Sequence, residues 1–261
     1  VLQVIAGYDP ADPITAAARA HPVPDYLQQL DPHGLQGARL GVVRQVSNRP
    51  AADPEILQRF QQALDALRRA GATVIDPVTL PVYDTIAPNA YWCPRFKYDL
   101  ENYLKSLGPP APVRTLAAIL ESGRFHPSIR SRLQFFAQFS GPLENYRNFR
   151  QAQAHRQRLQ SAVGELMQQQ ELDALVYPTW SNPPRRIGDL ESPHGDNSQI
   201  LSPQTGFPAI TVPMGYVRGT LPVGLQLMGL AWTEATLIKL AYAYEQATHH
   251  RVAPCTTPPL P

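Results

Sequence analysis

Residues 206–229 read GFPAITVPMGYVRGTLPVGLQLMG, and this stretch predicts an antiparallel β-hairpin. Its first half holds the β-branched run AITV, and a polar turn follows at 218–220. Large apolar side chains then occupy every second position from Val223 to Leu227. Short apolar runs bounded by Gly and Pro are typical of buried strands, and a Gly-containing connection joins two of them into a hairpin. Pro222 lacks the amide hydrogen that a ladder needs, so we expect it at a strand start or on an edge.

A β-α-β unit is predicted before the hairpin. The segments 37–43 (GARLGVV) and 72–75 (ATVI) are short and apolar, as buried strands are. Between them, Asp53 suits the N-cap of a helix and Pro54 suits its first turn. This helix is predicted to end at Gly71 and to bury one face, made of Ile56, Phe60, Ala63, Leu64 and Leu67. Because a β-α-β crossover joins parallel strands, we expect part of the sheet to be parallel.

Most of the remaining chain is predicted to be helical. Residues 1–7 (VLQVIAG) favour the last turns of a helix that a C-terminal glycine ends. Residues 83–170 carry helical patterns that break once at 109–112 and finish in a long Gln- and Arg-rich helix over 147–170. A final amphipathic helix over 234–248 is predicted to bury Leu237, Leu240, Ala241, Tyr244 and Ala247.

Composition and charge restrict the class of protein. The 261-residue chain is 43% hydrophobic and 17% charged, which is typical of a globular protein. Its net charge of +2 gives no reason to expect nucleic acid or a membrane surface as partner, and no apolar stretch could span a bilayer. The seven histidines and the two cysteines, Cys93 and Cys255, lack metal-ligand spacing, and no Walker or G-x-G-x-x-G motif occurs. We therefore expect no cofactor, and a cytoplasmic rather than a secreted protein.

The hairpin and the block LDALVYPT at 172–179, predicted as a strand over 172–177, closely resemble the C-terminal half of the amidase signature family. Members of that family hydrolyse carboxamide bonds. The opening VLQVIAGYDPADP, the β-α-β unit and the closing AYAYEQAT helix follow in family order, so the resemblance covers essentially the whole chain. It implies an α/β fold with a mixed central sheet wrapped by helices. Residues 1–261 would form the C-terminal portion of a single amidase signature domain, without its catalytic N-terminal portion.

The resemblance also implies a mechanism whose residues we do not find in the chain. The family uses a serine nucleophile, a second serine held by a cis peptide and a lysine, and the serines belong to a Gly- and Ser-rich motif with a Ser-Ser pair. A desolvated neutral lysine can activate the hydroxyl, and backbone N–H groups hold the oxyanion. No Ser-Ser pair occurs here, and Ser140-Gly141 is followed by Pro142, which has no backbone donor. We assign no catalytic residue and expect the triad upstream of the segment that resembles Val1.

Two loops are candidates for binding substrate, and both belong to the long polar stretch over 180–204 or adjoin it. The first covers 178–182 and offers Thr179 and Trp180. It leaves the C-terminal end of a predicted strand, where ligands bind in open α/β sheets. A plain surface loop is the alternative interpretation.

The second candidate loop covers 195–205 and offers Asp196, Asn197, Ser198 and Thr205. In family members that take glutamine and serve tRNA charging, an acidic residue stands at the position of Ser198 and pairs with the substrate amine. Serine supplies no such charge, which argues against glutamine and favours a general or peptide-type amidase.

A helix arginine and a group of aromatic residues have two interpretations each. Arg158 stands at the spacing where glutamine-specific relatives carry a carboxylate-binding arginine, but a solvated arginine on a helix face is the favoured interpretation. Aromatic residues could line an apolar acyl pocket, although core packing is the default for Tyr91, Trp92, Phe96, Phe135 and Phe136.

Three functions follow from these observations. The first is the C-terminal half of an amide hydrolase, whose partners are a small-molecule or peptide amide substrate and the upstream catalytic half. The second is a non-catalytic remnant or scaffold subunit with the same fold, and the third is the glutaminase subunit of a tRNA-dependent amidotransferase. If the chain is the C-terminal half of an amide hydrolase, the chain alone is expected to be inactive and to expose a large apolar surface.

Overall fold

The computed structural model describes residues 1–81, 83 and 95–253, and the chain divides into two compact units. The first unit combines Val1–Asp84 with Leu159–Pro261, and the second is Thr85–Arg158. Tyr91, Trp92, Cys93 and Cys255 lie outside the described residues.

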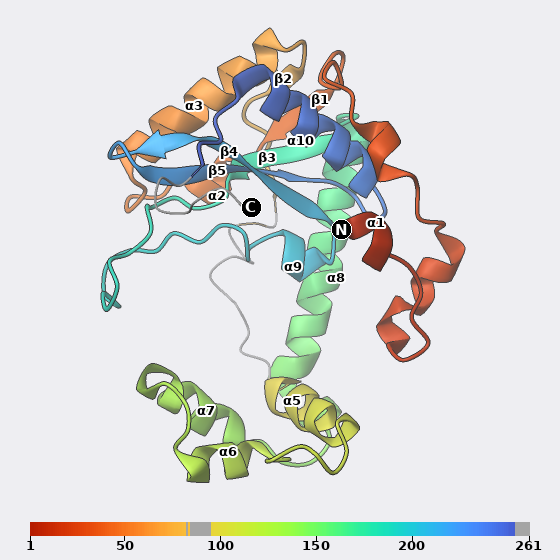
Figure 1. Ribbon diagram of the computed structural model, residues 1–261, viewed down its shortest axis with the longest axis vertical. Coiled ribbons are helices and arrows are strands. Elements are labelled where there is room, and N and C mark those ends of the chain that lie inside the picture. The colour runs from red at the N-terminus through yellow and green to blue at the C-terminus, as the bar shows by residue number, and fades with distance from the viewer. Residues whose placement is uncertain (82, 84–94, 254–261) are drawn as a thin grey trace, which may run out of the picture. The chain divides into compact units, whose positions relative to one another are not determined.

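A five-stranded mixed sheet organises the first unit (Figure 1). The strand order is β2-β1-β3-β5-β4. Strand β1 runs parallel to β2 and β3, whereas β5 runs antiparallel to β3 and β4. The bounds are β1 Arg39–Val42, β2 Thr73–Ile75, β3 Ala174–Pro178, β4 Ala209–Val217 and β5 Leu221–Met228. The predicted parallel unit and the predicted hairpin are both confirmed.

The prolines of the hairpin lie at an edge or at the start of a strand, where a missing backbone N–H costs least stability. Pro213 belongs to β4, which is an edge strand, and a register shift follows it at Gly215. Pro222 is the second residue of β5 and pairs only with Tyr216, because β3 contacts β5 from Leu225 onward. Proline is tolerated at such edge and starting positions because no ladder bond is lost there.

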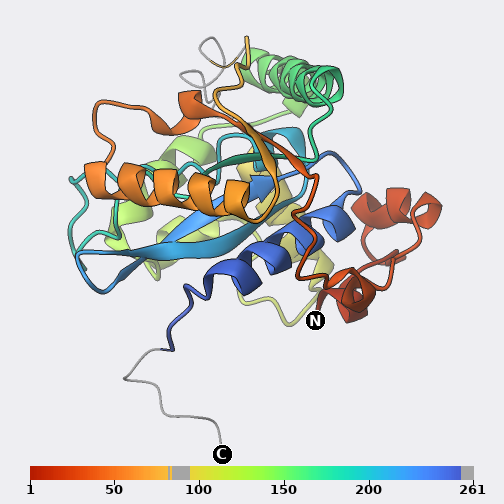
Figure 2. The same cartoon turned by 90° about the horizontal axis from the view of Figure 1, so that it is seen from above.

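Two helices cover one face of this sheet, and Figures 1 and 2 show them on the same side. Helix α3 (Pro54–Arg69) begins at Asp53, whose carboxylate accepts from the backbone N–H groups of Glu55 and Ile56, as predicted. Helix α10 (Glu234–Thr248) packs beside it. Both contribute to one core cluster with alternate strand residues, among them Phe60, Leu64, Val176, Leu225, Leu227 and Tyr244. Each large side chain buried there contributes roughly 1.5–3 kcal/mol.

Three predictions about element ends need correction. The strand at 172–177 begins two residues later, because Leu172 N–H donates back to Met167 and finishes the turn after a helix. The first helix, α1 (Leu2–Ile5), ends at Ala6 in an extended conformation, so Gly7 is not its cap. Ala247 is exposed in the last turn of α10, and Ala243 joins the buried face instead.

Apart from the C-terminal part of a long helix that begins in the second unit, the remaining elements of the first unit are short. They are the 3-10 helices η1 (Pro13–Ala20) and η2 (Tyr26–Gln29) and the α-helices α2 (Arg44–Ser47) and α9 (Ser202–Thr205). None of the helices in the described part of the chain is both long and apolar enough to cross a membrane.

The second unit is helical over its described residues, 95–158, as predicted. It holds α5 (Arg95–Ser106), α6 (Leu116–Ser122), η3 (Pro127–Ile129), α7 (Arg130–Ala137), η4 (Leu143–Asn145) and the first part of α8 (Arg147–Gln169). The break predicted at 109–112 separates α5 from α6. Leu116, Leu133 and Phe136 form its small core, and Phe96 stacks at a tilt on Phe136.

Candidate substrate-binding site

A strip of polar side chains crosses the sheet face opposite α3 and α10. Side chains alternate between faces along a strand, so Tyr177, Gln226 and Thr211 point away from the core residues Val176 and Leu225. Gln226 pairs with Tyr177 on one side and Thr211 on the other. We call Tyr177, Thr179, Thr211 and Gln226 the polar strip, and its outer end is Thr211, which is exposed.

The inner end of the strip is a buried hydrogen-bonded group. Gln226 donates from Nε2 to the Tyr177 hydroxyl at 3.2 Å, and that hydroxyl donates to the Met228 sulfur at 3.8 Å. Burial raises the pKa of Tyr177, so its hydroxyl stays neutral. Gln226 is 3% exposed, and its Oε1 has no partner among the described residues. A buried acceptor without a donor is rare and points to a donor that the described residues do not supply.

The outer end of the strip brings two hydroxyl groups together. Thr179 Oγ1 lies 3.2 Å from Thr211 Oγ1. Gly224 lies between them, and a Cβ there would be 2.6 Å from Thr211 Cγ2 and 2.8 Å from Thr179 Oγ1. The Thr179 N–H also donates to the Gly224 carbonyl at 2.8 Å. Glycine therefore allows both hydroxyl groups to stand at the same point of the sheet.

The two candidate loops are held against each other. Trp180 forms an isolated antiparallel bridge with Asp196, Ser181 N–H donates to Gly195 at 2.7 Å, and Asn197 N–H donates to Thr179 at 3.0 Å. A Cβ at Gly195 would lie 3.1 Å from the backbone nitrogen of Asn182, which is tighter than an ordinary contact, and the positive φ of +62° also favours glycine there. The structure thus joins the end of β3 to residues that follow it by more than a dozen positions.

The buried side chain of Asn197 links the two loops through hydrogen bonds. This side chain is fully buried and donates to the Pro178 carbonyl at 2.9 Å and to Ser181 Oγ at 2.8 Å. A carbonyl oxygen can only accept, so the Pro178 bond fixes which end of the amide is NH₂. Asn197 therefore holds the loop in shape, and its Oδ1 is buried without a partner among the described residues.

The other predicted residues of the second loop also bond locally. The Asp196 carboxylate accepts from the backbone and hydroxyl of Ser198 at 3.0 and 2.6 Å and from Gln199 Nε2 at 2.6 Å. Thr205 is buried, and its hydroxyl donates to the Leu201 carbonyl at 2.9 Å. The Thr205 carbonyl accepts from Gln160 Nε2. These groups shape the loop before β4.

Trp180 and Arg158 differ in their surroundings. Trp180 is 40% exposed, and its ring meets that of His194 edge-on at 6.1 Å between centroids. Arg158 is exposed on α8 in the second unit.

The sequence analysis predicted Thr179 and Trp180 as candidates and did not predict Tyr177, Thr211, Gln226 or Gly224, which the structure places beside Thr179. One signal was available, because Gln226 stands between Leu225 and Leu227 in an otherwise apolar strand. A polar residue at the alternate position marks a face that differs from the core face. No group of three or more potential ligand side chains (His, Cys, Asp or Glu) that could hold a metal occurs within residues 1–81, 83 and 95–253.

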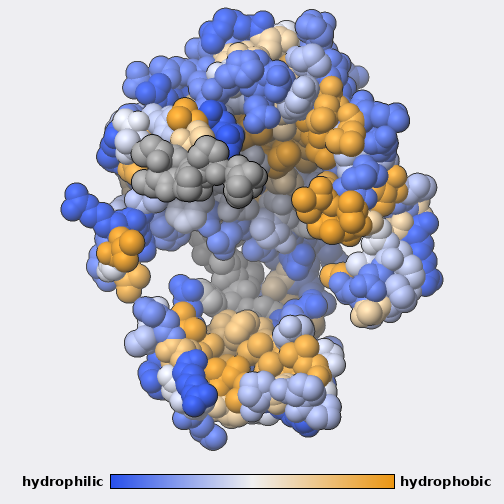
Figure 3. All heavy atoms as spheres, viewed as in Figure 1, coloured by the Kyte–Doolittle hydropathy of each residue, from blue (hydrophilic) through white to orange (hydrophobic). Residues whose placement is uncertain are grey.

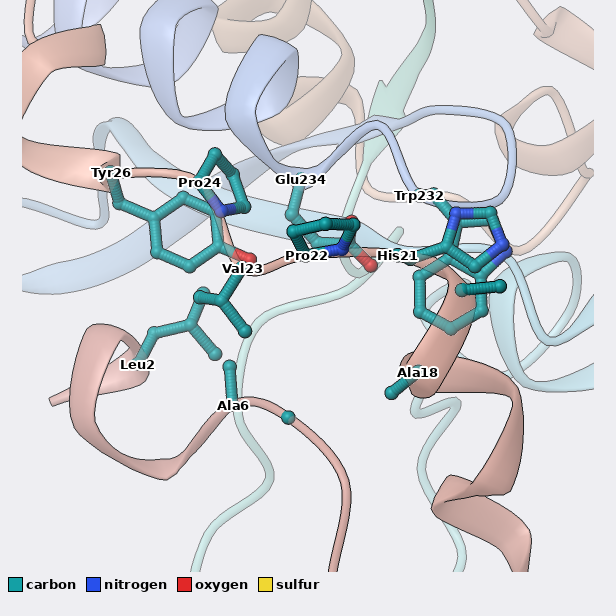
Figure 4. A pocket seen from close by; sticks show the side chains of 12 residues that line it. Leu2, Ala6, Ala18, His21, Pro22, Val23, Pro24, Tyr26, Trp232 and Glu234 are labelled. Carbon is teal, nitrogen blue, oxygen red and sulfur yellow. The ribbon is translucent and has the colours of Figure 1, made fainter.

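An apolar pocket of about 300 Å³ lies beside α1 (Figure 4). The rings of His21 and Trp232 stack at 3.9 Å at one end, and Leu2, Val23 and Tyr26 gather at the other. Burial, together with the nearby Glu234 carboxylate, raises the pKa of Tyr26.

A sheet of this order, with a polar strip on one face and a hairpin that reads GFPAITVPMG, agrees with one known family. The sequence matches the Amidase family over residues 1–238. The chain belongs to the amidase signature family. The mixed sheet wrapped by helices, expected from the resemblance, is confirmed.

Solved structures of this family share the fold. A native peptide amidase from Stenotrophomonas maltophilia is 34% identical, with a TM-score of 0.78, and the match covers 96% of this chain and 51% of that one. An amidase family protein from Bacillus anthracis has a TM-score of 0.72 at 22% identity, which shows the fold alone.

The matches to curated relatives also cover nearly all of this chain and about half of each relative. A glutamyl-tRNA(Gln) amidotransferase subunit from Myxococcus xanthus is 32% identical over 260 residues, covering 94% of this chain and 51% of the relative. The protein of the same name from Acinetobacter baumannii is 28% identical over 260 residues, covering 95% of this chain and 51% of the relative. The chain spans about half the length of the relatives that it matches.

Proposed function

We propose that this chain supplies the C-terminal half of an amide hydrolase and that the polar strip, with Trp180 beside it, forms one wall of the substrate pocket. The observation that carries the proposal is the Thr179–Thr211 hydroxyl pair at the C-terminal end of β3, on the sheet face opposite α3 and α10. Hydroxyl groups both donate and accept, so the pair can bind the C=O or the N–H of a carboxamide. The Trp180 ring offers an apolar surface to the group that carries the amide.

The chemistry itself is assigned to residues upstream. A serine hydroxyl needs a base to become a nucleophile. The family uses a lysine as this base and places its two serines in a Gly- and Ser-rich segment with a Ser-Ser pair. The 261 residues contain no Ser-Ser pair and three lysines, Lys97, Lys105 and Lys239. We propose that the catalytic groups come from an upstream half and that this chain alone does not hydrolyse amides.

The surface around α1 is the proposed contact with that half. Val1, Val4 and Ile5 are 99%, 85% and 72% exposed, and Figure 3 shows apolar residues gathered there. Exposed apolar patches of this kind mark interaction sites. The pocket in Figure 4 opens beside the same helix, and Leu2 lines it. We propose that upstream residues cover α1 and fill this pocket.

A peptide-type or general amide is the proposed substrate. The 34% identity to a peptide amidase supports this class. The relatives named as glutamyl-tRNA(Gln) amidotransferase subunits support a glutaminase as the second candidate. Ser198 weighs against it, because a hydroxyl supplies no charge for the substrate amine. Asp196, two residues earlier, does not replace that charge, since its carboxylate is bonded to Ser198 and Gln199.

The test is ammonia release by the chain alone and by the chain extended in frame with its upstream coding sequence. The extended protein is expected to release ammonia from a peptide C-terminal amide faster than from glutamine, and the chain alone should release none. Faster release from glutamine would favour the glutaminase. Absence of release by a folded extended protein, from glutamine and from aliphatic, aryl and peptide amides, would favour a non-catalytic scaffold.

A variant pair tests the polar strip within that assay. Thr179→Val removes one hydroxyl of the proposed wall and should lower kcat/KM by about tenfold, the effect of losing one hydrogen bond of about 1.4 kcal/mol. Thr220→Val changes an exposed turn residue at the far end of the hairpin and should leave kcat/KM unchanged. Equal kcat/KM values for the two variants would show that the polar strip is not a wall of the substrate pocket.

A further inference from the structure

A second pocket, of about 680 Å³, opens between the loop after β3 and the end of the hairpin. We call it the arginine pocket. Its lining contains no residue of the polar strip and not Trp180, so it is separate from the proposed amide site. The residues that line it are Asp53, Asn182, Pro183, Pro184, Arg185, Arg186, Ile187, Asp189, Ser192, Pro193, Arg218 and Leu221.

Both carboxylates in this lining already have partners. Asp53 caps α3 and pairs with Arg218 at 2.5 Å. Asp189 accepts from the backbone N–H groups of Glu191 and Ser192 at 3.0 Å each. Hydrogen bonds from the side chain and backbone of Ser192 and from the backbone of Glu191, with a smaller contribution from the Arg185 charge, lower the pKa of Asp189 to about 2. Asp189 therefore stays ionised and is held within its own turn.

The charge of Arg185 acts on Asp189, but within the described part of the chain neither Arg185 nor Arg186 forms an ion pair of the kind that joins Asp53 to Arg218. Among the described residues, no carboxylate lies within 4.0 Å of the guanidinium of Arg185 or Arg186. The Nε of Arg185 is buried and has no hydrogen-bond partner there. A buried cationic donor that loses water without gaining an acceptor is costly, and the cost rises with burial. The arrangement indicates an acceptor that comes from a ligand.

The charge and shape of the pocket select the kind of acceptor. The lining carries three arginines and two carboxylates, so its net charge is +1, which suits one negative charge better than two. Guanidinium groups form paired N–H···O bonds with the two oxygens of a carboxylate. Pro183, Pro184, Ile187 and Leu221 add apolar surface, and Ile187 is fully exposed. Ligand pockets combine such surface with a few polar groups.

We propose that the arginine pocket binds a carboxylate carried on an apolar group, with Arg185 and Arg186 as its ligands. A free organic acid and the C-terminal carboxylate of a peptide share this chemistry. The proposal does not depend on amide hydrolysis, because it rests on residues of the described chain alone.

The experiment is calorimetric titration of the full 261-residue chain with benzoate and, separately, with N-acetyl-leucine. Each acid is compared with its neutral amide, benzamide or N-acetyl-leucinamide, which keeps the shape and removes the charge. The acids are expected to bind and the amides to bind at least tenfold more weakly, with weaker binding of the acids at higher salt. The tighter of the two acids identifies the source, a free acid or a peptide end.

Variants assign the binding to the pocket. Arg185→Gln and Arg186→Gln should each weaken binding of the acid about tenfold or more, and thermal unfolding should show that both variants still fold. Arg69→Gln, at the exposed end of α3, removes an arginine of the same charge and should bind as the unchanged chain does. Two variants in the pocket keep the test decisive if one of them fails to fold.

Three results would overturn the proposal. They are equal binding of an acid and its amide, tighter binding of inorganic phosphate than of either acid, and unchanged binding of the acids by both pocket variants.

Discussion

At the scale of single residues, close contacts around Gly224 determine how β5 meets its neighbours. The nearest atoms to a Cβ at this position belong to the side chains of Thr211 and Thr179, at 2.6 and 2.8 Å. Neither is the far end of a flexible side chain, so a larger residue must push the strands apart. This contact links a short stretch of sequence to the geometry of the polar strip.

Gly224→Ala is therefore expected to lower the free energy of unfolding by about 1–3 kcal/mol, the usual cost of overpacking. Gly164→Ala is the matched control, because Gly164 lies within α8 and nothing lies within 4 Å of its added Cβ. That change should stabilise the chain by about 0.5–1 kcal/mol, since glycine is a poor helix former. Urea denaturation measures both, and the same sign for both would contradict the prediction.

Asn197→Ala removes two hydrogen bonds from a fully buried side chain. The Pro178 carbonyl and the Ser181 hydroxyl then lose their donor in a place with little water, so we expect a loss of about 2–4 kcal/mol. Asn182→Ala, in the same loop, breaks no hydrogen bond of a described side chain and should stay within about 0.5 kcal/mol. If the denaturation curves of the two variants coincide, Asn197 does not hold the loop in shape.

At the scale of elements, the start of α3 combines a cap with an ion pair. Asp53 caps the helix through Oδ1 and binds Arg218 through Oδ2 at 2.5 Å. Asp53→Ala should cost about 1–2 kcal/mol, the value of a lost cap. Asp53→Asn keeps a capping oxygen and should recover most of that loss, because a half-exposed ion pair is worth about 0–1 kcal/mol. Thermal unfolding measures the stability of both variants. Equal losses of stability in Asp53→Ala and Asp53→Asn would assign the effect to the ion pair.

The end of α10 predicts a pH dependence. Burial, with a smaller effect of the Arg59 charge, lowers the pKa of His250 from its usual 6.5. The unfolded chain then binds the proton more readily than the folded chain. Stability contributed by neutral His250 is therefore fully present above pH 6.5 and is lost as the pH falls through the folded-state pKa.

His250→Gln should accordingly flatten the decline in the free energy of unfolding as the pH falls from about 7 to 5. The measurement is urea denaturation at several pH values for the unchanged chain and the variant. A decline of equal steepness in both would show that His250 does not carry the effect.

At the scale of the whole molecule, the apolar surface around α1 predicts how the chain behaves alone. Val1, Val4 and Ile5 are largely exposed, and Trp232 is 47% exposed beside the pocket in Figure 4. The isolated chain is expected to bind a hydrophobic dye, and the chain extended upstream should bind less of it. A monomeric, cooperatively folded chain that binds no dye would contradict this expectation.

The sequence predicted the elements well, and it named only some of the residues that the structure brings together at the candidate site. Asp53 and Pro54 fixed the start of α3, because a cap acts on N–H groups two and three residues away. Thr179 and Trp180 could be named because they follow a strand. The partner of Thr179 could not, since Thr211 lies 32 residues further along the chain.

The sequence by itself determined the hairpin, the β-α-β unit, the helical segments and the family, because local periodicity, caps and short motifs encode them. Only the tertiary structure decided which polar groups meet. The pairing of β3 with β5 places Tyr177 against Gln226, and the closure of the loop buries Asn197 under Pro178. These contacts depend on which residues of distant strands lie opposite one another. The alternation along one strand tells which face a side chain takes, but it does not name that distant partner.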